Sequence, residues 1–241
     1  MPNHLIAPTL LVFQIVAHIA LVSMFWLAEP WMWFVVVFMY FVNGCIGMTS
    51  GYHKLLSHKS WNPPRWLEIF VTLCATVGLT GPAIGWIANH RKHHRYSDSD
   101  DDPQSPIVHG WWRTQYLSMF FKVEPKYAAH LLRDRFMVFQ NKYYFHINIA
   151  WGLIAALLFQ DWYAMVYAWL APAAVLWTLG SLIVSSSHRK REAKNDWWLA
   201  LLVWGEGWHE NHHRRAGDWR FHNTLDPSAW FIGLCKFLRI G

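Results

Sequence analysis

Charged side chains are scarce in this chain of 241 residues. Asp, Glu, Lys and Arg together make up 15% of the sequence, whereas about a quarter is usual for a globular protein. Hydrophobic residues reach 54%, and so apolar a composition excludes a disordered chain. A soluble domain rarely has so few charges, so the composition indicates a protein that contacts a lipid bilayer.

Cysteine is also scarce, with Cys45, Cys74 and Cys235 the only three in the sequence. Three scattered thiols exclude a disulfide framework and a zinc site built from thiolates. The N-terminus lacks a basic region, so we expect no cleavable signal peptide. No repeat, low-complexity tract or linker divides the sequence, which predicts one domain over residues 1–241. Nothing in it indicates a nucleic-acid partner.

Lysine and arginine are absent from two long stretches, residues 1–52 and 143–187. Each stretch holds one acidic residue near its middle, Glu29 or Asp161. A helix needs about 20 apolar residues to cross the hydrocarbon core, so each stretch suffices for two crossings joined by a short turn. The sequence therefore predicts an all-α membrane protein with four transmembrane helices in two hairpins, at residues 5–28, 31–52, 143–160 and 162–187.

All 21 Lys and Arg lie in the two remaining stretches, which the positive-inside rule places in the cytoplasm. This topology predicts a helical cap on the cytoplasmic face. The apolar segment 66–87 could be a fifth crossing, but it contains Glu68 and the helix-breaking Gly81-Pro82 pair. We therefore expect it to lie in the cytoplasmic interface. The brevity of the chain favours a bacterial inner membrane over an endoplasmic reticulum.

Histidine is in excess, with 15 copies, and eight of them form three clusters. His53 and His58 follow the second predicted crossing, and their i, i+5 spacing predicts that they reach around a metal cluster. The other two clusters share the spacing His-x-x-His-His, which on a helix should point three imidazoles the same way. Eight imidazoles exceed the needs of one four-coordinate zinc and suit two ions, although imidazole alone does not name the metal. The second and third clusters are His90, His93 and His94, and His209, His212 and His213.

A ninth candidate ligand is His188, which ends the fourth predicted crossing at the same depth as His53. A metal-bound imidazole usually donates its other N–H group to a carboxylate or a carbonyl. Carboxylates follow the second cluster and precede the third. We expect Asp98, Asp102 and Glu206 to accept these hydrogen bonds.

The clusters and their flanks resemble those of the membrane-bound fatty acid desaturases, most closely the stearoyl-CoA (Δ9 acyl) branch, over about residues 40–215. The motifs are Gly51-Tyr-His53-Lys-Leu-Leu-Ser-His58, His90-Arg-Lys-His93-His94 and Gly205-Glu206-Gly207-Trp208-His209-Glu-Asn-His212-His213. The resemblance implies two iron ions at the cytoplasmic face, which use dioxygen to introduce a cis double bond into a long acyl chain. It also implies nine ligands: His53, His58, His90, His93, His94, His188, His209, His212 and His213.

Two positions depart from the family pattern. Acyl-CoA members carry Arg-Asp before the second box, positioned for the CoA head group, whereas this chain has Ala88-Asn89. The carrier of the acyl chain could therefore be CoA or a membrane lipid. Members also place an Asn four residues before the ninth histidine, where it holds a water on one iron, and here that residue is Val184. Ser185, at i−3 from His188, could replace it.

Such a reaction needs electrons, and the sequence has no haem, iron–sulfur or dinucleotide motif. We expect a separate donor, such as a ferredoxin, a rubredoxin or a cytochrome b5, attracted by the basic surplus of the cytoplasmic side. The main alternative function keeps the metal centre but hydroxylates the acyl chain. A membrane metal transporter is a remote alternative, because transporters place ionisable residues near the bilayer midplane and these crossings are nearly free of charge.

Overall fold

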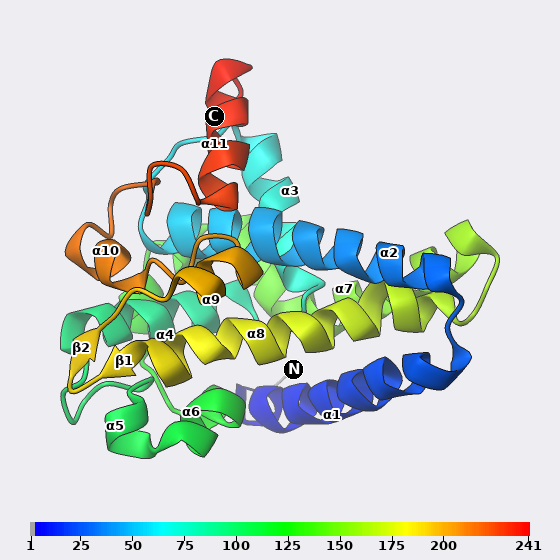
Figure 1. The fold of residues 1–241 in the computed structure, drawn as a ribbon, viewed down its shortest axis with the longest axis horizontal. Coiled ribbons are helices and arrows are strands. Elements are labelled where there is room, and N and C mark those ends of the chain that lie inside the picture. Colours follow the sequence, from blue (N-terminus) through cyan, green and yellow to red (C-terminus); the bar gives the residue numbers. More distant parts are fainter. Residues whose placement is uncertain (1–2) are drawn as a thin grey trace.

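The computed structural model describes residues 3–241, with side chains from residue 6 onward. The chain is mostly helical, and its long helices run side by side while shorter elements gather at one end of them (Figure 1). Two of the long helices are α1 (Asn3–Leu27) and α7 (Arg135–Phe159). Two more combine an α-helix with a π-helical stretch: α2 (Pro30–Tyr40) continues as the π-helix η1 (Phe41–Ser57), and the π-helix η5 (Val166–Leu170) continues as α8 (Ala171–Ser187).

The shorter elements form the cap and the connections to it. Two strands of two residues each, β1 (His188–Arg189) and β2 (Glu192–Ala193), pair antiparallel directly after α8. The others are α3 (Arg65–Thr76), α4 (Ala83–Tyr96), α5 (Pro106–His109), α6 (Trp111–Tyr116), η2 (Ser118–Phe120), η3 (Pro125–Ala128), η4 (Leu131–Arg133), α9 (Trp197–Leu202), α10 (His209–Arg214) and α11 (Pro227–Phe237).

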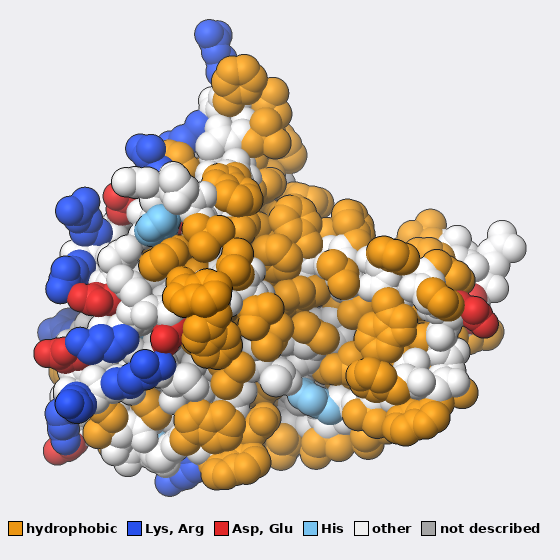
Figure 2. All heavy atoms as spheres, viewed as in Figure 1, with side chains coloured by type: hydrophobic (Ala, Val, Ile, Leu, Met, Phe, Trp, Pro, Cys, Tyr) orange, Lys and Arg blue, Asp and Glu red, His pale blue; other side chains and the backbone are white. Residues whose placement is uncertain are grey.

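Three helical segments are long and apolar enough to cross a membrane: Ile6–Leu27, Pro30–Ser57 and Val166–Ser187. Hydrophobic side chains cover the visible face of the long helices, and the charged side chains gather at the end that carries the cap (Figure 2). Soluble monomers rarely expose so large an apolar surface. The prediction of an all-α membrane protein is confirmed in this form, whereas α7, the third of the four predicted crossings, is not among the three segments.

Two of the predicted crossings have different bounds in the structure. The second was expected to end at residue 52, but its helix continues as η1 to Ser57, so His53 lies within the helix. The third was expected to begin at residue 143, but α7 begins at Arg135, because the side chain of Asp134 accepts hydrogen bonds from the first backbone N–H groups. The position 143 is instead a kink, where Tyr143 has φ −106° and ψ 18°.

The segment 66–87 forms two helices rather than one. α3 has 12 residues, which is too few to cross a bilayer, and it packs against η1. Gly81, with φ +109°, and Pro82 then turn the chain into α4. The segment therefore brings the second histidine cluster back to the end of η1 without a fifth crossing.

The close packing of η1 on α3 depends on Gly47. A Cβ atom at this position would lie 2.3 Å from the backbone nitrogen of Ala75. We expect Gly47→Val to destabilise the fold by about 1–3 kcal/mol or more, measured as a lower thermal midpoint of the purified protein in detergent. Gly217→Ala is the control, because a Cβ atom there meets nothing within 4 Å. Equal midpoints for the wild type and Gly47→Val would contradict this explanation.

Candidate metal centre

All nine predicted histidines lie together at the cap end of the long helices. They form two adjacent groups, and within each group the candidate ligand atoms lie within 4.8 Å of one another. The five-histidine group consists of His53, His58, His90, His94 and His212, and the four-histidine group consists of His93, His188, His209 and His213.

The rings of each group converge through their Nε2 atoms. In the five-histidine group, Nε2 of His212 lies 2.9 Å from Nε2 of both His53 and His94. In the four-histidine group, Nε2 of His209 lies 2.9 Å from that of His188 and 3.2 Å from that of His213. Each group therefore presents several nitrogen atoms to one small volume.

The π-helical geometry of η1 explains why the first pair joins a single group. A π-helix bonds residue i to residue i+5, and the backbone N–H of His58 donates to the carbonyl of His53. Residues five apart thus lie nearly above each other, and the two ring centroids are 5.1 Å apart. The expectation that the i, i+5 pair spreads around both ions was wrong, because it assumed an α-helical turn.

The second and third clusters each divide between the two groups. In α4, His90 and His94 at i and i+4 join the five-histidine group, while His93 joins the other. In α10 the residues at i and i+4 again share a group and the residue at i+3 joins the other, but here the i, i+4 pair belongs to the four-histidine group. The expectation that each cluster points three imidazoles the same way was therefore wrong in detail, because 100° between His93 and His94 is enough to turn them toward different centres. The division of α10 places His209 and His213 in the four-histidine group and His212 in the five-histidine group.

Three buried or half-buried carboxylates hold the far side of three rings. Nδ1 of His53 lies 2.6 Å from Glu206, and Nδ1 of His188 lies 2.8 Å from Asp98. Both oxygens of Asp102 lie 2.9 Å from Nδ1 of the third ring, which belongs to His93. A carboxylate at Nδ1 keeps the proton there and leaves the Nε2 lone pair free, which is the tautomer that a metal ligand needs.

Burial favours the neutral form of several of these histidines. It lowers the pKa of His58 and of His213 to about 2; neighbouring imidazoles contribute to both shifts, and Arg91 contributes to that of His58. The pKa values of His90, His209 and His212 are well below the usual range, again mainly because of burial. Neutral imidazoles with free lone pairs are competent ligands at neutral pH.

The donor set fits a metal ion. Nε2 of His93 is buried and has no hydrogen-bond partner among the described residues, although its ring lies 4.8 Å from the ring of His188 and 5.1 Å from that of His213. A buried nitrogen without a partner is costly, and an ion bound between these rings would remove the cost. Imidazole ligands suit iron, zinc, copper and nickel.

Ser185 has a different partner from the one expected. Its hydroxyl donates to Oε1 of Gln115 at 2.6 Å, and Gln115 in turn donates to the carbonyl of Thr178. The serine therefore joins α8 to α6. Val184, its neighbour, lines the cavity described next.

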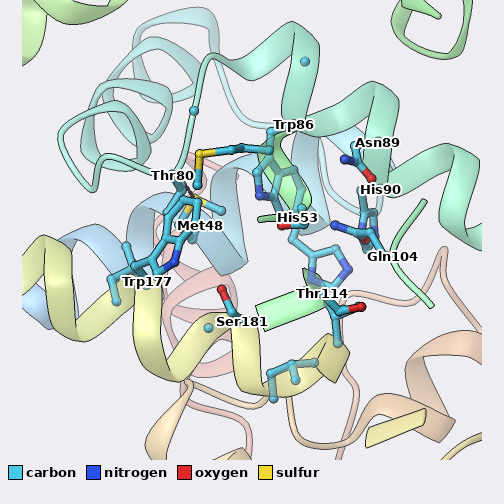
Figure 3. A pocket seen from close by; sticks show the side chains of 18 of the residues that line it. Met48, His53, Thr80, Trp86, Asn89, His90, Gln104, Thr114, Trp177 and Ser181 are labelled. Carbon is cyan, nitrogen blue, oxygen red and sulfur yellow. Dashed lines mark hydrogen bonds between the residues drawn. The ribbon is translucent and has the colours of Figure 1, made fainter. Parts of the chain in front are cut away.

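A cavity of about 280 Å³ lies against the histidines (Figure 3). Its wall includes His53 and His90 of the five-histidine group and His209 of the four-histidine group. Met48, Thr80 and Trp177 lie together at one side of the cavity, away from His90 (Figure 3). The lining is mainly apolar and comes from α1, η1, α4, α6, η2, α8 and α10 and from the segments between the helices.

Most of this wall could not be found from the sequence. Trp177 and Met48 have no distinctive spacing, and in a chain with 18 Trp residues a single one carries no signal. Trp86 is an exception, because it lies four residues before His90 and so on the same face of α4. The two rings stack with centroids 5.1 Å apart. Trp86 therefore covers the ring of His90 where the second cluster meets the cavity.

Comparison with known proteins identifies the class of protein. The family model for fatty acid desaturases matches residues 29–224, so the chain belongs to the fatty acid desaturase family and is an oxidoreductase. It is 34% identical to the sn-1 stearoyl-lipid 9-desaturase of Anabaena variabilis over 193 residues, which cover 74% of this chain and 70% of that protein.

Two further relatives widen the comparison. The chain is 32% identical to the sn-2 palmitoyl-lipid 9-desaturase of Nostoc sp. (strain 36) over 238 residues, which cover 88% of this chain and 82% of the relative. It is 30% identical to the acyl-CoA 5-desaturase AL21 of Anemone leveillei, with 90% and 70% covered. The predicted family is confirmed, but the stearoyl-CoA branch is not, because the two most similar of these relatives are acyl-lipid desaturases.

We predict that the histidines at the cavity wall are individually essential. Alanine at His53, His90 or His209 should lower activity more than about 100-fold, because removing a ligand costs more than removing its hydrogen-bond partner, and should lower the metal content of the purified protein. His146→Ala is the control, because this exposed ring on α7 belongs to neither group. Metal content and activity near wild type in any of the three variants would remove that histidine from the ligand set.

Proposed function

We propose that this protein is an oxygen-dependent di-iron desaturase that introduces a cis double bond, in a Δ9-like position, into a long acyl chain carried by a membrane lipid. One observation carries the proposal. Histidines of both groups form part of the wall of a single apolar cavity. An acyl chain in that cavity would lie against both candidate metal sites.

In this proposal the two histidine groups each hold one iron ion. When bound, the irons supply the oxidising power, with dioxygen, that ordinary acid–base side chains lack for breaking the C–H bonds of a methylene pair. The chain's own residues fix the ligands: Asp98, Asp102 and Glu206 orient three imidazoles through Nδ1. The role of Ser185 as a water-holding residue is not retained, because its hydroxyl is bonded to Gln115.

The cavity supplies binding and water exclusion. Leu10 from α1, Met48 from η1 and Trp177 from α8 form apolar parts of its wall, and burying a methylene group there is favourable by about 0.8 kcal/mol. A straight apolar chain gains no orientation from hydrogen bonds, so the shape of the wall selects which methylene pair lies beside the histidines. Dry walls also protect a reactive centre from side reactions.

The carrier is inferred from the polar part of the same wall. Asn89, Gln104 and Thr114 line the cavity, and Oδ1, Oε1 and Oγ1 of these side chains are buried with no hydrogen-bond partner within the described part of the chain. Among the described residues, no Lys or Arg lines this cavity, and Ala88 is buried in the core beside α3 and η1. The two amide oxygens can accept a hydrogen bond from a hydroxyl group of a glycerolipid, and the hydroxyl of Thr114 can donate one to an ester oxygen. The phosphates of CoA only accept and are usually bound by cationic groups, so this wall suits a glycerolipid better.

The membrane arrangement that we propose has four crossings. α7 would provide the fourth, over residues 143–159, because its apolar side chains Leu153, Leu157 and Leu158 are exposed along this half of the helix. The charged cap would then face the cytoplasm, by the positive-inside rule. A bacterial inner membrane remains the proposed location.

The electrons would come from a separate protein. Basic residues dominate the charged end of the molecule (Figure 2), and Lys190, Arg191 and Arg214 are exposed there. A basic surface favours an acidic donor such as a ferredoxin, a rubredoxin or a cytochrome b5 and speeds its association. Salt should therefore weaken the rate of electron delivery more than it weakens substrate binding.

The experiment that tests the function is product analysis. We expect expression in a host with saturated membrane lipids to yield new cis monounsaturated acyl chains, identified by mass spectrometry with double-bond localisation. The His212→Ala variant, which lacks one ligand of the five-histidine group, is the inactive control. Hydroxylated acyl chains in place of monoenes would support the alternative oxidation, and an unchanged lipid profile with a competent electron donor present would contradict both.

A second prediction concerns the carrier. Thr114→Val keeps the volume of the side chain but removes its hydroxyl, and a lost hydrogen bond of about 0.5–1.5 kcal/mol should raise KM for an acyl-lipid substrate about 2–10-fold with little change in kcat. Thr72→Val is the control, because its hydroxyl bonds within α3, outside the cavity. Exclusive turnover of acyl-CoA over acyl-lipid in vesicles would overturn the lipid assignment.

A further inference from the structure

A buried ion pair lies directly beside the five-histidine group. Lys54, the residue after His53, is fully buried, and its ammonium group lies 3.0 and 3.1 Å from the two carboxylate oxygens of Asp226. It also donates to the hydroxyl of Ser228 at 2.6 Å. Neither member is a candidate metal ligand, and the desaturase reaction as described above uses neither. A fully buried charge pair is expensive to desolvate, which calls for an explanation.

Asp226 organises the segment that follows the third histidine cluster. Its carboxylate accepts hydrogen bonds from the backbone N–H groups of Phe221 at 2.8 Å and Ala229 at 3.0 Å, and from the hydroxyl of Ser228 at 2.7 Å. The same carboxylate caps the first turn of α11. One side chain of the cap is thus bonded to both ends of the segment 221–229 and to a lysine of η1.

Phe221 lies between the buried ion pair and the histidines and contacts both. The ammonium group of Lys54 lies 4.0 Å from the centroid of the Phe221 ring, a favourable cation–π distance. The same ring lies 4.5 Å from the ring of His212 and 5.6 Å from that of His53, measured between centroids. Phe221 is therefore a wall behind two rings of the five-histidine group.

The chain that carries Glu206 also passes against the ion pair. Gly205 has φ +103°, and a Cβ atom on it would lie 2.4 Å from Oδ1 of Asp226. The next residue, Glu206, bonds Nδ1 of His53. The carboxylate of Asp226 thus touches the loop that orients His53 as well as the loop that backs it.

We propose that Lys54, Asp226 and Phe221 are positioning residues that hold His53 and His212 in the arrangement that binds a metal ion. In the described part of the chain, the four-histidine group has no such contact with Lys54, Asp226 or Phe221. These three residues, which we call the clamp, therefore act on one of the two groups. The proposal rests on the proposed function only in taking the five-histidine group as an iron site. The proposal explains why the Lys54–Asp226 ion pair is buried. Its directional hydrogen bonds fix the positions of the neighbouring histidine rings, whereas an apolar contact would allow them to shift.

The test counts metal in purified full-length protein. Lys54→Met removes the ammonium group at similar length, and Phe221→Leu removes the ring but keeps the ion pair. We expect each variant to bind about one iron per chain where the wild type binds two, by elemental mass spectrometry, and to lose one of two quadrupole doublets in the Mössbauer spectrum. Lys126→Met, which breaks an exposed ion pair with Glu124, should keep both.

Double variants locate the remaining ion. His53→Ala added to Lys54→Met should remove no further iron, whereas His209→Ala added to it should remove the rest. Lys54→Met with Asp226→Asn leaves no uncompensated charge and keeps an oxygen acceptor for the N–H of Phe221, so it should regain part of the lost iron. If Lys54→Met fails to accumulate, Phe221→Leu decides the question.

Each result has one meaning. Two irons and an unchanged spectrum in Phe221→Leu would overturn the clamp, and so would equal loss of iron from both sites, because a general structural defect would not choose between them. A wild-type protein that binds no iron under the same conditions would instead overturn the proposed function.

Discussion

Nine imidazole rings meet at the cap, with Nε2 atoms of each group turned toward one another. This polar, largely buried centre is the constraint on which the rest of the structure depends. A nitrogen lone pair buried without a partner is unfavourable, and Nε2 of His93 has none among the described residues. Packing alone would not assemble such a centre. It persists because carboxylates fix the tautomers from outside and because an ion can satisfy the nitrogens from inside.

Helix geometry then decides how the nine candidate ligands divide between the two histidine groups. In α4 and α10 the i and i+4 residues of each cluster share a group, and the residue between them crosses to the other. Each of these helices therefore contributes to both sites and ties their positions together. In η1 two histidines also share a group, but they are five residues apart, because the wider π-helical turn aligns His53 with His58. Two helical geometries thus serve one pair of sites.

The sequence predicted the histidines and their carboxylates but not the space around them. Spacing and cluster repetition predicted eight of the rings, and the position of His188 at the end of a predicted crossing added the ninth. The general need of a bound imidazole for an acceptor predicted Asp98, Asp102 and Glu206. The π-helix of η1 was missed, because apolar periodicity does not distinguish it from an α-helix over one or two turns. Lys54 was missed for a different reason. From the sequence, a lysine beside a histidine cluster is expected to be exposed to solvent, and its partner in the buried ion pair lies 172 positions later in the chain.

The order of residues along η1 connects the wall of the cavity with the histidines. Met48 and Thr49 line the apolar cavity, His53 lies at its wall, and Lys54 lies on the side of the ion pair. Seven consecutive positions on one helix, 48 to 54, therefore pass from the cavity wall through a candidate ligand to the residue that we propose holds that ligand in place. A substitution in the cavity wall that tilts this helix must move His53 as well, because the cavity residues and His53 lie on adjoining turns of one rigid helix. Trp177, by contrast, lines the cavity from α8, and Ala171–Ser187 contains no histidine, because His188 follows its last residue. A different side chain at Trp177 can therefore change the cavity without moving a candidate ligand on the same turn.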